Sequence, residues 1–228
     1  MQQQLQQSPM AVDGGWLYVA EIVHRIGNEY TSAIASMRLA AAKSSSTEAK
    51  AALNRAAGQL GAFATAHRVL QPPLAEGVVN LADSLTRLCK AVTLASLQDR
   101  GISLSLEVPR LLLLDASRCW RTKLIVGELI TNAARHAFAT EGGAIKVAVT
   151  LAAGQVACEV SDNGAGPATF TPGTGTQLVD SLAAELGGHV QRRFAEHGST
   201  VTLLFPGRPT EATQDDGSAG WANSWSPV

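Results

Sequence analysis

The chain has 228 residues, of which 46% are hydrophobic and 16% are charged, and its formal net charge at pH 7 is −1. This length allows one large domain or two small ones, and the near-zero charge excludes nucleic-acid binding through a basic surface. The apolar runs are far shorter than the roughly 20 residues that span a bilayer, and the Gln-rich N-terminus lacks the features of a secretion signal. We therefore expect a cytoplasmic protein with no membrane insertion, no nucleic-acid partner and no room for a long sensory region.

Two long helices are predicted in the first third of the chain. From Trp16 to about Lys43, apolar residues recur in alternating steps of four and three, as in a helix with a coiled-coil-like seam. Thr47 is placed to cap a second helix, which the Pro72–Pro73 pair ends. An antiparallel hairpin of two such helices cannot bury its own seam. We therefore expect a homodimer in which two hairpins form a four-helix bundle.

The remainder of the chain alternates between helical and strand patterns. The predicted elements are a helix at 74–98, a strand at 102–108, a helix at 117–138, strands at 144–151 and 155–161, a helix at 177–186, and strands at 189–194 and 199–205. Helices and antiparallel strands in this order predict an α+β fold, in which a two-layer α/β sandwich follows the two-helix hairpin. The expected domains are a flexible N-terminus (1–14), the hairpin (15–73), the sandwich (74–207) and a disordered tail (208–228).

Glu128, Asn132 and His136 lie four residues apart on one predicted helix, so they project from a single face. A carboxylate and an amide oxygen at this spacing are suitable ligands for Mg²⁺. His136 would face an anionic group, and its neighbour Arg135 is predicted to bind the cofactor at the same place. The alternative interpretation is the solvated side of an amphipathic helix.

A second segment, Asp162-Asn-Gly164-Ala-Gly166, follows a predicted strand. An acidic side chain at a strand end suits hydrogen bonding to an exocyclic amine such as that of adenine, and glycine at both positions removes the obstruction of a Cβ atom. The alternative is an ordinary Asp-Asn-Gly hairpin turn.

Gly173 and Gly175 precede the predicted helix at 177–186. Glycines at that place leave free N–H groups and the positive end of the helix dipole for phosphates, although the segment matches neither a Walker A loop nor a dinucleotide fingerprint. The fourth segment, Gly198-Ser-Thr200, leads into the last strand. Thr200 is placed there to add a hydroxyl near the adenine base.

The order of these four segments resembles the ATP-binding domain of the superfamily of histidine kinases, gyrases and heat-shock protein 90. Residues 128–138 resemble its N box, 162–166 its G1 box and 173–175 its G2 box. The resemblance implies that Asn132 is a ligand of Mg²⁺ and that Asp162 contacts adenine, with ATP and Mg²⁺ as cofactors. It also implies a short ATP lid between Gly166 and Gly173, without a clear F box.

The first helix carries the sequence EIVHRIGN, which resembles the phosphoacceptor motif of the second dimerisation class of histidine kinases, with its His-Arg-x-x-Asn signature. The resemblance implies that His24 is phosphorylated, and Glu21 and Asn28 share its helical face. The family usually has His-His-Arg and a second Asn, whereas Val23 and Glu29 occupy those places here. Since no acidic residue directly follows His24, Glu21 is the candidate general base.

The resemblance implies a homodimeric histidine kinase core without a sensor domain of its own. Such a core autophosphorylates from ATP and passes the phosphoryl group to an aspartate on the receiver domain of a response regulator, and a separate sensor protein, a ligand or the termini supply its signal. Two alternatives stay open: a histidine phosphotransferase that another kinase phosphorylates, and a switch protein that binds a partner through its ATP domain. Trp221 and Trp225 in the tail either form a docking motif or have no specific role.

Overall fold

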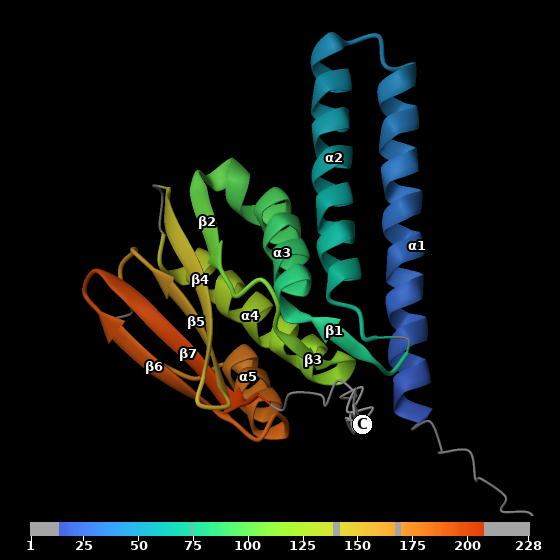
Figure 1. Ribbon diagram of the computed structural model, residues 1–228. Coiled ribbons are helices and arrows are strands. Elements are labelled where there is room, and N and C mark those ends of the chain that lie inside the picture. The colour runs from blue at the N-terminus through green and yellow to red at the C-terminus, as the bar shows by residue number, and fades with distance from the viewer. Residues whose placement is uncertain (1–13, 74, 139–141, 167–169, 208–228) are drawn as a thin grey trace, which may run out of the picture.

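The computed structural model describes residues 14–73, 75–138, 142–166 and 170–207, with side chains from residue 25 onward. A long helical hairpin lies beside an α/β sandwich (Figure 1). Among the described residues, no helix combines the length and the apolar character needed to cross a bilayer. The predicted lead-in up to residue 13 and the tail from residue 208, with Trp221 and Trp225, lie outside the described residues.

The hairpin consists of α1 (Gly14–Lys43) and α2 (Thr47–Val69), so the first helix includes Gly14. Ser46, rather than Thr47, caps α2, because its hydroxyl accepts the Ala49 N–H at 3.2 Å. The expected cap is therefore wrong by one residue. In this single chain, large apolar side chains of the hairpin such as Leu39 and Phe63 remain exposed.

The helix expected at 74–98 begins later than predicted. A short strand, β1 (Val78–Asn80), comes first and pairs with β3 (Leu113–Asp115), and α3 (Leu81–Val92) follows it. The helical path then continues as a π turn at 93–97 and a 3₁₀ turn at 98–100. A three-residue strand is too short to show an alternating pattern, which explains why the sequence did not indicate β1 or β3.

A five-stranded sheet forms one layer of the sandwich. Its strands, in spatial order, are β2 (Ile102–Glu107), β4 (Gly143–Ala152), β5 (Gln155–Asp162), β7 (Gly198–Pro206) and β6 (His189–Ala195). β2 pairs in parallel with β4, whereas the other neighbours are antiparallel. The parallel pair corrects the expectation of antiparallel strands alone, since β3 and a long helix separate β2 from β4 along the chain.

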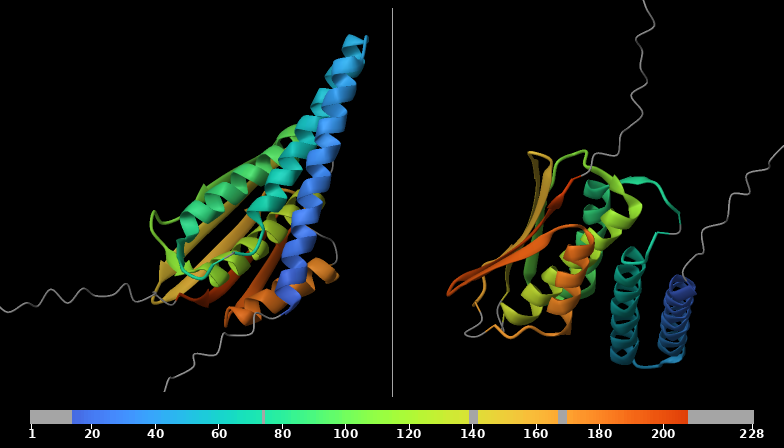
Figure 2. Two further views of the ribbon diagram at one scale, coloured as in Figure 1. Left: turned by 90° about the vertical axis from the view of Figure 1, so that its right-hand side faces the viewer. Right: turned by 90° about the horizontal axis from the view of Figure 1, so that it is seen from below.

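Three helices, α3, α4 (Ala116–His136) and α5 (Thr174–Glu185), form the second layer and lie between the sheet and the hairpin (Figures 1 and 2). One core fills the space between the layers, and it includes Leu85, Leu88, Ile125, Ile130, Val147, Cys158, Leu203 and Phe205. The buried face of α4 holds this helix against the sheet. The side chains on its other faces are therefore fixed relative to the ends of the strands.

Candidate active site

A cavity of about 690 Å³ lies between α4, the end of β5, the start of α5 and the β6–β7 hairpin. Most of the residues predicted to bind nucleotide or metal line it, namely Glu128, Asn132, Arg135, His136, Asp162, Gly173 and Gly175. Folding thus brings three separate sequence segments to one cavity, whose volume is in the range of small-molecule and cofactor sites.

Helix α4 supplies one side of the cavity. Glu128 and Asn132 are partly buried, and His136 is exposed in the last turn. Ile125 and Val126, just before Glu128, and Ile130, between Glu128 and Asn132, are buried in the core. The four-residue spacing of the polar side chains therefore keeps these polar groups on the cavity side of the helix.

Asp162 is partly buried at the end of β5. Its Oδ1 accepts the Gly164 N–H at 3.0 Å. Burial raises the pKa of this carboxyl, although hydrogen bonds from Gly164 and from the backbone and hydroxyl of Ser199 act in the opposite direction. Because the charged form is incompletely solvated, a further N–H donor from a ligand would stabilise it.

Gly164 and Gly166 do not line the cavity, whereas the intervening Ala165 does. A Cβ atom on Gly164 would lie 2.2 Å from the carbonyl oxygen of Ala137, and one on Gly166 would lie 2.0 Å from that of Ala195. The Ala165 N–H also donates to the Ala137 carbonyl at 2.9 Å. These glycines therefore let the turn pack against the end of α4 and against β6, and their direct contact with nucleotide stays a prediction.

Replacing Gly166 with alanine is expected to lower the free energy of unfolding by about 1–3 kcal/mol, because a methyl group would overlap a backbone oxygen. Urea denaturation of both proteins measures this loss. Gly58→Ala is the matched control, since a Cβ atom there meets nothing within 4 Å and alanine favours a helix. Equal stability of Gly166→Ala and the unaltered protein would contradict the close packing of the turn.

The first turn of α5 forms another wall of the cavity. This helix begins at Thr174, three residues before the predicted start, and Gly173 is its N-cap. A Cβ atom on Gly175 would lie 2.0 Å from Oε1 of Glu128, so the carboxylate lies against the helix N-terminus. The N-terminal N–H groups and the positive end of the dipole favour negative charge here. Phosphate groups and the Glu128 carboxylate would therefore share one region.

The chemistry of Glu128 and Asn132 fits a cation that is shared with phosphate. In the part of the chain that the structure describes, no group of three or more His, Cys, Asp or Glu side chains could hold a metal by itself. Mg²⁺ commonly binds through one or two protein oxygen ligands together with substrate phosphates and water. One carboxylate and one amide beside a helix N-terminus match that mode of binding.

Sequence reasoning missed a cluster of aromatic and basic side chains in the cavity wall. The rings of Phe170 and Phe194 have centroids 4.9 Å apart, and the guanidinium of Arg192 lies 5.8 Å from the Phe170 centroid. Arg192 is also paired with Asp180 of α5 at 2.8 Å. No short motif links these residues, since only the register of β6 and the fold of the 170–173 segment bring them together.

Ser199, rather than Thr200, lines the cavity on β7. Successive side chains of a strand point to opposite faces of the sheet, so Ser199 and Val201 lie on the cavity side. The hydroxyl expected from Thr200 is therefore supplied by its neighbour. Only the register of β7 decides between these two adjacent residues.

The predicted acceptor residues lie on α1, away from the lining of the cavity. The side chains of Glu21 and His24 are outside those that the structure describes, and Asn28 is exposed. Further along the hairpin, the ring centroids of Tyr30 and of the exposed His67 lie 5.8 Å apart, so these two rings contact each other across the two helices. The roles of Glu21, His24 and Asn28 stay predictions.

Two family models match the chain. Residues 91–205 match the model described as a histidine kinase-like ATPase domain, and residues 21–96 match a model described as histidine kinase. Together the two ranges include the hairpin from Glu21 onward and all the residues that line the cavity.

The sensor histidine kinase PdtaS of Mycobacterium tuberculosis is 30% identical over 197 residues, which cover 82% of this chain and 39% of the relative. PdtaS of Mycolicibacterium smegmatis is 31% identical over 206 residues, which cover 86% and 41% respectively. The chain thus spans about two fifths of the length of the curated relatives that it matches.

Solved histidine kinases share the fold. The histidine kinase domain of the Erythrobacter litoralis EL346 blue-light activated histidine kinase aligns with a TM-score of 0.57 and 20% identity, over 79% of this chain and 96% of that one. Acinetobacter baumannii AdeS aligns with a TM-score of 0.51 and 17% identity, over 84% and 98%. A helical hairpin followed by an α/β sandwich is therefore the architecture of these kinases too.

Proposed function

Because this chain belongs to the histidine kinases that carry a histidine kinase-like ATPase domain, we propose that it is a kinase core which transfers the γ-phosphoryl group of ATP to His24. The observation that carries this proposal is the cavity in which Glu128, Asn132, Asp162 and the 173–175 turn meet. A solvated helix face or an isolated hairpin turn would not require these segments to converge.

The polarity of the cavity suggests how ATP would lie in it. The Asp162 carboxylate would accept a hydrogen bond from the exocyclic amine of adenine, and the apolar Val160, Val179 and Val201 would contact the base. The phosphates would then extend toward the N-terminus of α5 and toward Arg135 and His136 of α4. Glu128 and Asn132 would hold Mg²⁺, which neutralises phosphate charge and supports in-line transfer.

In the proposed reaction, a neutral imidazole nitrogen of His24 attacks the γ-phosphorus. An N–P bond forms, the bond to the β,γ-bridging oxygen breaks, and ADP leaves with that electron pair. Glu21 is the proposed base for the imidazole proton, and Asn28 would orient the ring from the next turn. The attacking nitrogen needs its lone pair, so the imidazole must be neutral in this step, which we place in the cytoplasm.

We also propose that two hairpins pair into a four-helix bundle. The exposed Leu39 and Phe63 support this pairing, because burial of apolar surface favours association. On the bundle, the phosphoryl group would pass from His24 to an aspartate of a response-regulator receiver domain, with cleavage of the N–P bond and formation of an acyl phosphate. A separate sensor protein is a further proposed partner.

Incubation of the protein with γ-labelled ATP tests the function. We expect protein-bound label that is lost in acid and stable in base, as a phosphoramidate is, and that moves to a receiver domain on addition. ATP labelled at the α-phosphate should leave no label and is the control. Absence of label together with absence of binding at millimolar ATP would contradict the kinase and favour a phosphotransferase.

A further inference from the structure

The C-terminal end of α2 has backbone carbonyls that its own helix cannot satisfy. Leu70 is the C-cap, and the chain continues through Gln71 to Pro72 and Pro73, of which the prolines have no N–H to donate. Two side chains of α4 bind there instead. The indole N–H of Trp120 donates to the Leu70 carbonyl at 2.9 Å, and Nζ of Lys123 donates to the Val69 carbonyl at 2.6 Å.

The two donors suit this position for different reasons. A cation is favourable at the negative end of a helix dipole, and Trp120 presents its N–H while its ring remains partly buried. Burial lowers the pKa of the Lys123 ammonium, with a smaller contribution in the same direction from Arg87 and an opposing one from Cys119. The Val69 carbonyl thus accepts a hydrogen bond from a partly desolvated charge.

Apolar packing accompanies these hydrogen bonds. A Cβ atom on Gly127 of α4 would lie 3.4 Å from Cδ2 of Leu70 and 3.7 Å from Cδ1 of Leu88 on α3, so the Leu70 side chain rests over a glycine between the two helices. Val69 and Leu70 both pack against the core. Apolar contact is non-directional, whereas the hydrogen bonds of Trp120 and Lys123 specify where α2 ends on α4.

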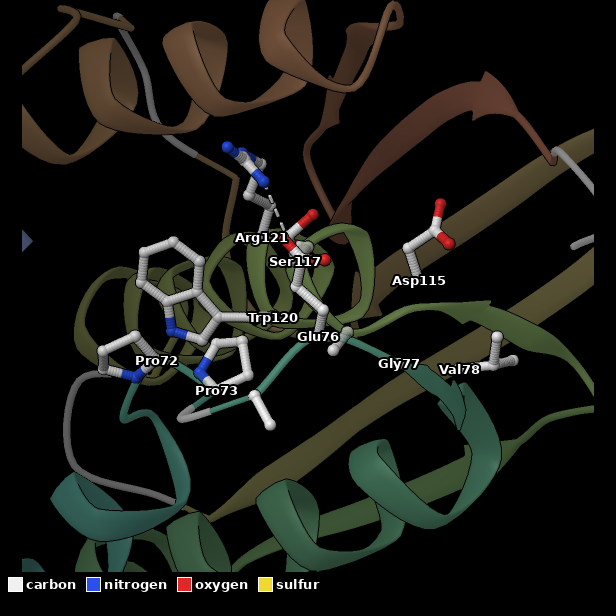
Figure 3. A pocket seen from close by; sticks show the side chains of 11 residues that line it. Pro72, Pro73, Glu76, Gly77, Val78, Asp115, Ser117, Trp120 and Arg121 are labelled. Atoms are coloured by element: carbon white, nitrogen blue, oxygen red, sulfur yellow. Dashed lines mark hydrogen bonds between the residues drawn. The ribbon is translucent and has the colours of Figure 1, made fainter. Parts of the chain in front are cut away.

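The segment after this contact is only loosely packed. A pocket of about 660 Å³ lies beside the 72–78 segment and the first turns of α4. In Figure 3, Trp120, Pro72 and Pro73 lie on one side of this pocket, and Asp115 and Val78 lie on the other. Because the connection itself is exposed, the packing of α2 holds the hairpin against the sandwich. This packing consists of its contacts with α3 and with the 93–97 turn, together with the hydrogen bonds of Trp120 and Lys123 at its end.

Helix α4 also carries the metal and phosphate residues of the nucleotide cavity. Glu128 follows Lys123 by five residues, which is about 7.5 Å along a helix, and Asn132 lies one turn further. A continuous α-helix is a rigid element, so the end of α2 and the phosphate end of the cavity are held in one body. A change in the position of α2 on α4 would displace the γ-phosphate relative to the hairpin.

We propose that Trp120 and Lys123 are positioning residues that fix the acceptor hairpin relative to the nucleotide cavity, so that they promote phosphoryl transfer without contributing to ATP binding. This inference rests on the proposed function, because it assumes transfer from the cavity to His24. It assigns to α4 a second task, in which one end of the helix holds the hairpin and the other end holds the phosphates.

The variants are Trp120→Phe, which removes the N–H and retains a ring, Lys123→Met, which retains the length and removes the donor, and their combination. We expect the double variant to bind a fluorescent ATP analogue within about twofold of the unaltered protein and to autophosphorylate at least about tenfold more slowly at saturating ATP. Lys123→Arg, which keeps a cationic donor, should largely restore the rate. Lys90→Met, at an exposed position of α3, is the matched control.

A second experiment measures the distance between the hairpin and the sandwich and does not depend on catalysis. Spin labels at Ser45→Cys, in the hairpin turn, and Glu196→Cys, in the β6–β7 turn, report the distance between the two parts. Both positions are exposed and the three native cysteines are buried, and dilution with unlabelled chains isolates distances within one chain. The double variant should give a broader distance distribution than the unaltered protein.

The outcomes separate the inference from the proposed function. If the unaltered protein is not phosphorylated by ATP, the proposed function is wrong. The distance distributions then still test whether Trp120 and Lys123 hold the hairpin in place. An equally narrow distribution in the double variant, an unchanged or increased transfer rate, or a loss of ATP affinity that matches the loss of rate would each overturn the positioning role.

Discussion

Replacing His24 with alanine is expected to reduce γ-phosphoryl labelling by at least about 1,000-fold while ATP affinity stays unchanged. The imidazole nitrogen is the proposed nucleophile, and alanine offers no atom that can form the phosphoramidate bond. Alanine is also the strongest helix former, so α1 should remain intact. Labelling with γ-labelled ATP gives the transfer rate, and titration with a fluorescent ATP analogue gives the affinity.

His197→Ala is the matched control for this loss, because His197 is exposed in the turn between β6 and β7. It should label like the unaltered protein. Glu21→Gln tests the proposed base separately, with an expected decrease of about 10²- to 10⁴-fold in rate if this carboxylate takes the proton. Acid-labile label that persists on the His24→Ala protein would rule out His24 as the acceptor.

The Asp162→Asn substitution is expected to weaken ATP binding by about 10- to 100-fold, the range for loss of a hydrogen bond to a charged group. An amide oxygen can still accept the Gly164 N–H, but the amide N–H₂ would face the adenine amine, donor against donor. Calorimetric titration measures the affinity, and circular dichroism checks the fold. Asp99→Asn, at an exposed position, is the control, and equal affinity of both variants would contradict the assigned base contact.

The raised pKa of Asp162 predicts a pH dependence of base binding. The ionised carboxylate accepts the adenine amine, so binding favours the charged form. Affinity should therefore be constant well above the folded-state pKa and should fall as the pH drops through it, starting at a higher pH than for an ordinary carboxyl group. Titration with adenosine, which has no phosphate to titrate, measures this decrease. The decrease should be absent in Asp162→Asn, and its persistence there would assign it to another group.

The long elements could be predicted because their patterns are local. The seam of α1 and α2, the alternation of β2 and the prolines after α2 each depend on neighbours within a few residues. β1 and β3 were missed because each is stabilised mainly by its partner more than thirty residues away. The parallel pairing of β2 with β4 also has no local signal, since it depends on where α4 packs.

The site shows the same division. Glu128, Asn132 and His136 could be identified together because helical spacing alone places them on one face. By contrast, the contact of Glu128 with the α5 terminus, the choice of Ser199 over Thr200, and the Phe170–Phe194 pair depend on how separate segments pack. Gly164 and Gly166 were expected to make room for a ligand, and the structure shows that they make room for the backbone of Ala137 and Ala195.

The sequence by itself determined the class of fold, the hairpin and the chemical groups of the nucleotide site, because helix periodicity, glycine turns and side-chain chemistry are properties of short segments. Only the tertiary structure decided which of these groups share a cavity, which glycines are required by backbone packing, and how Trp120 and Lys123 hold the end of α2. These features arise from contacts between residues far apart in the chain, and the close packing of one shared core sets their geometry.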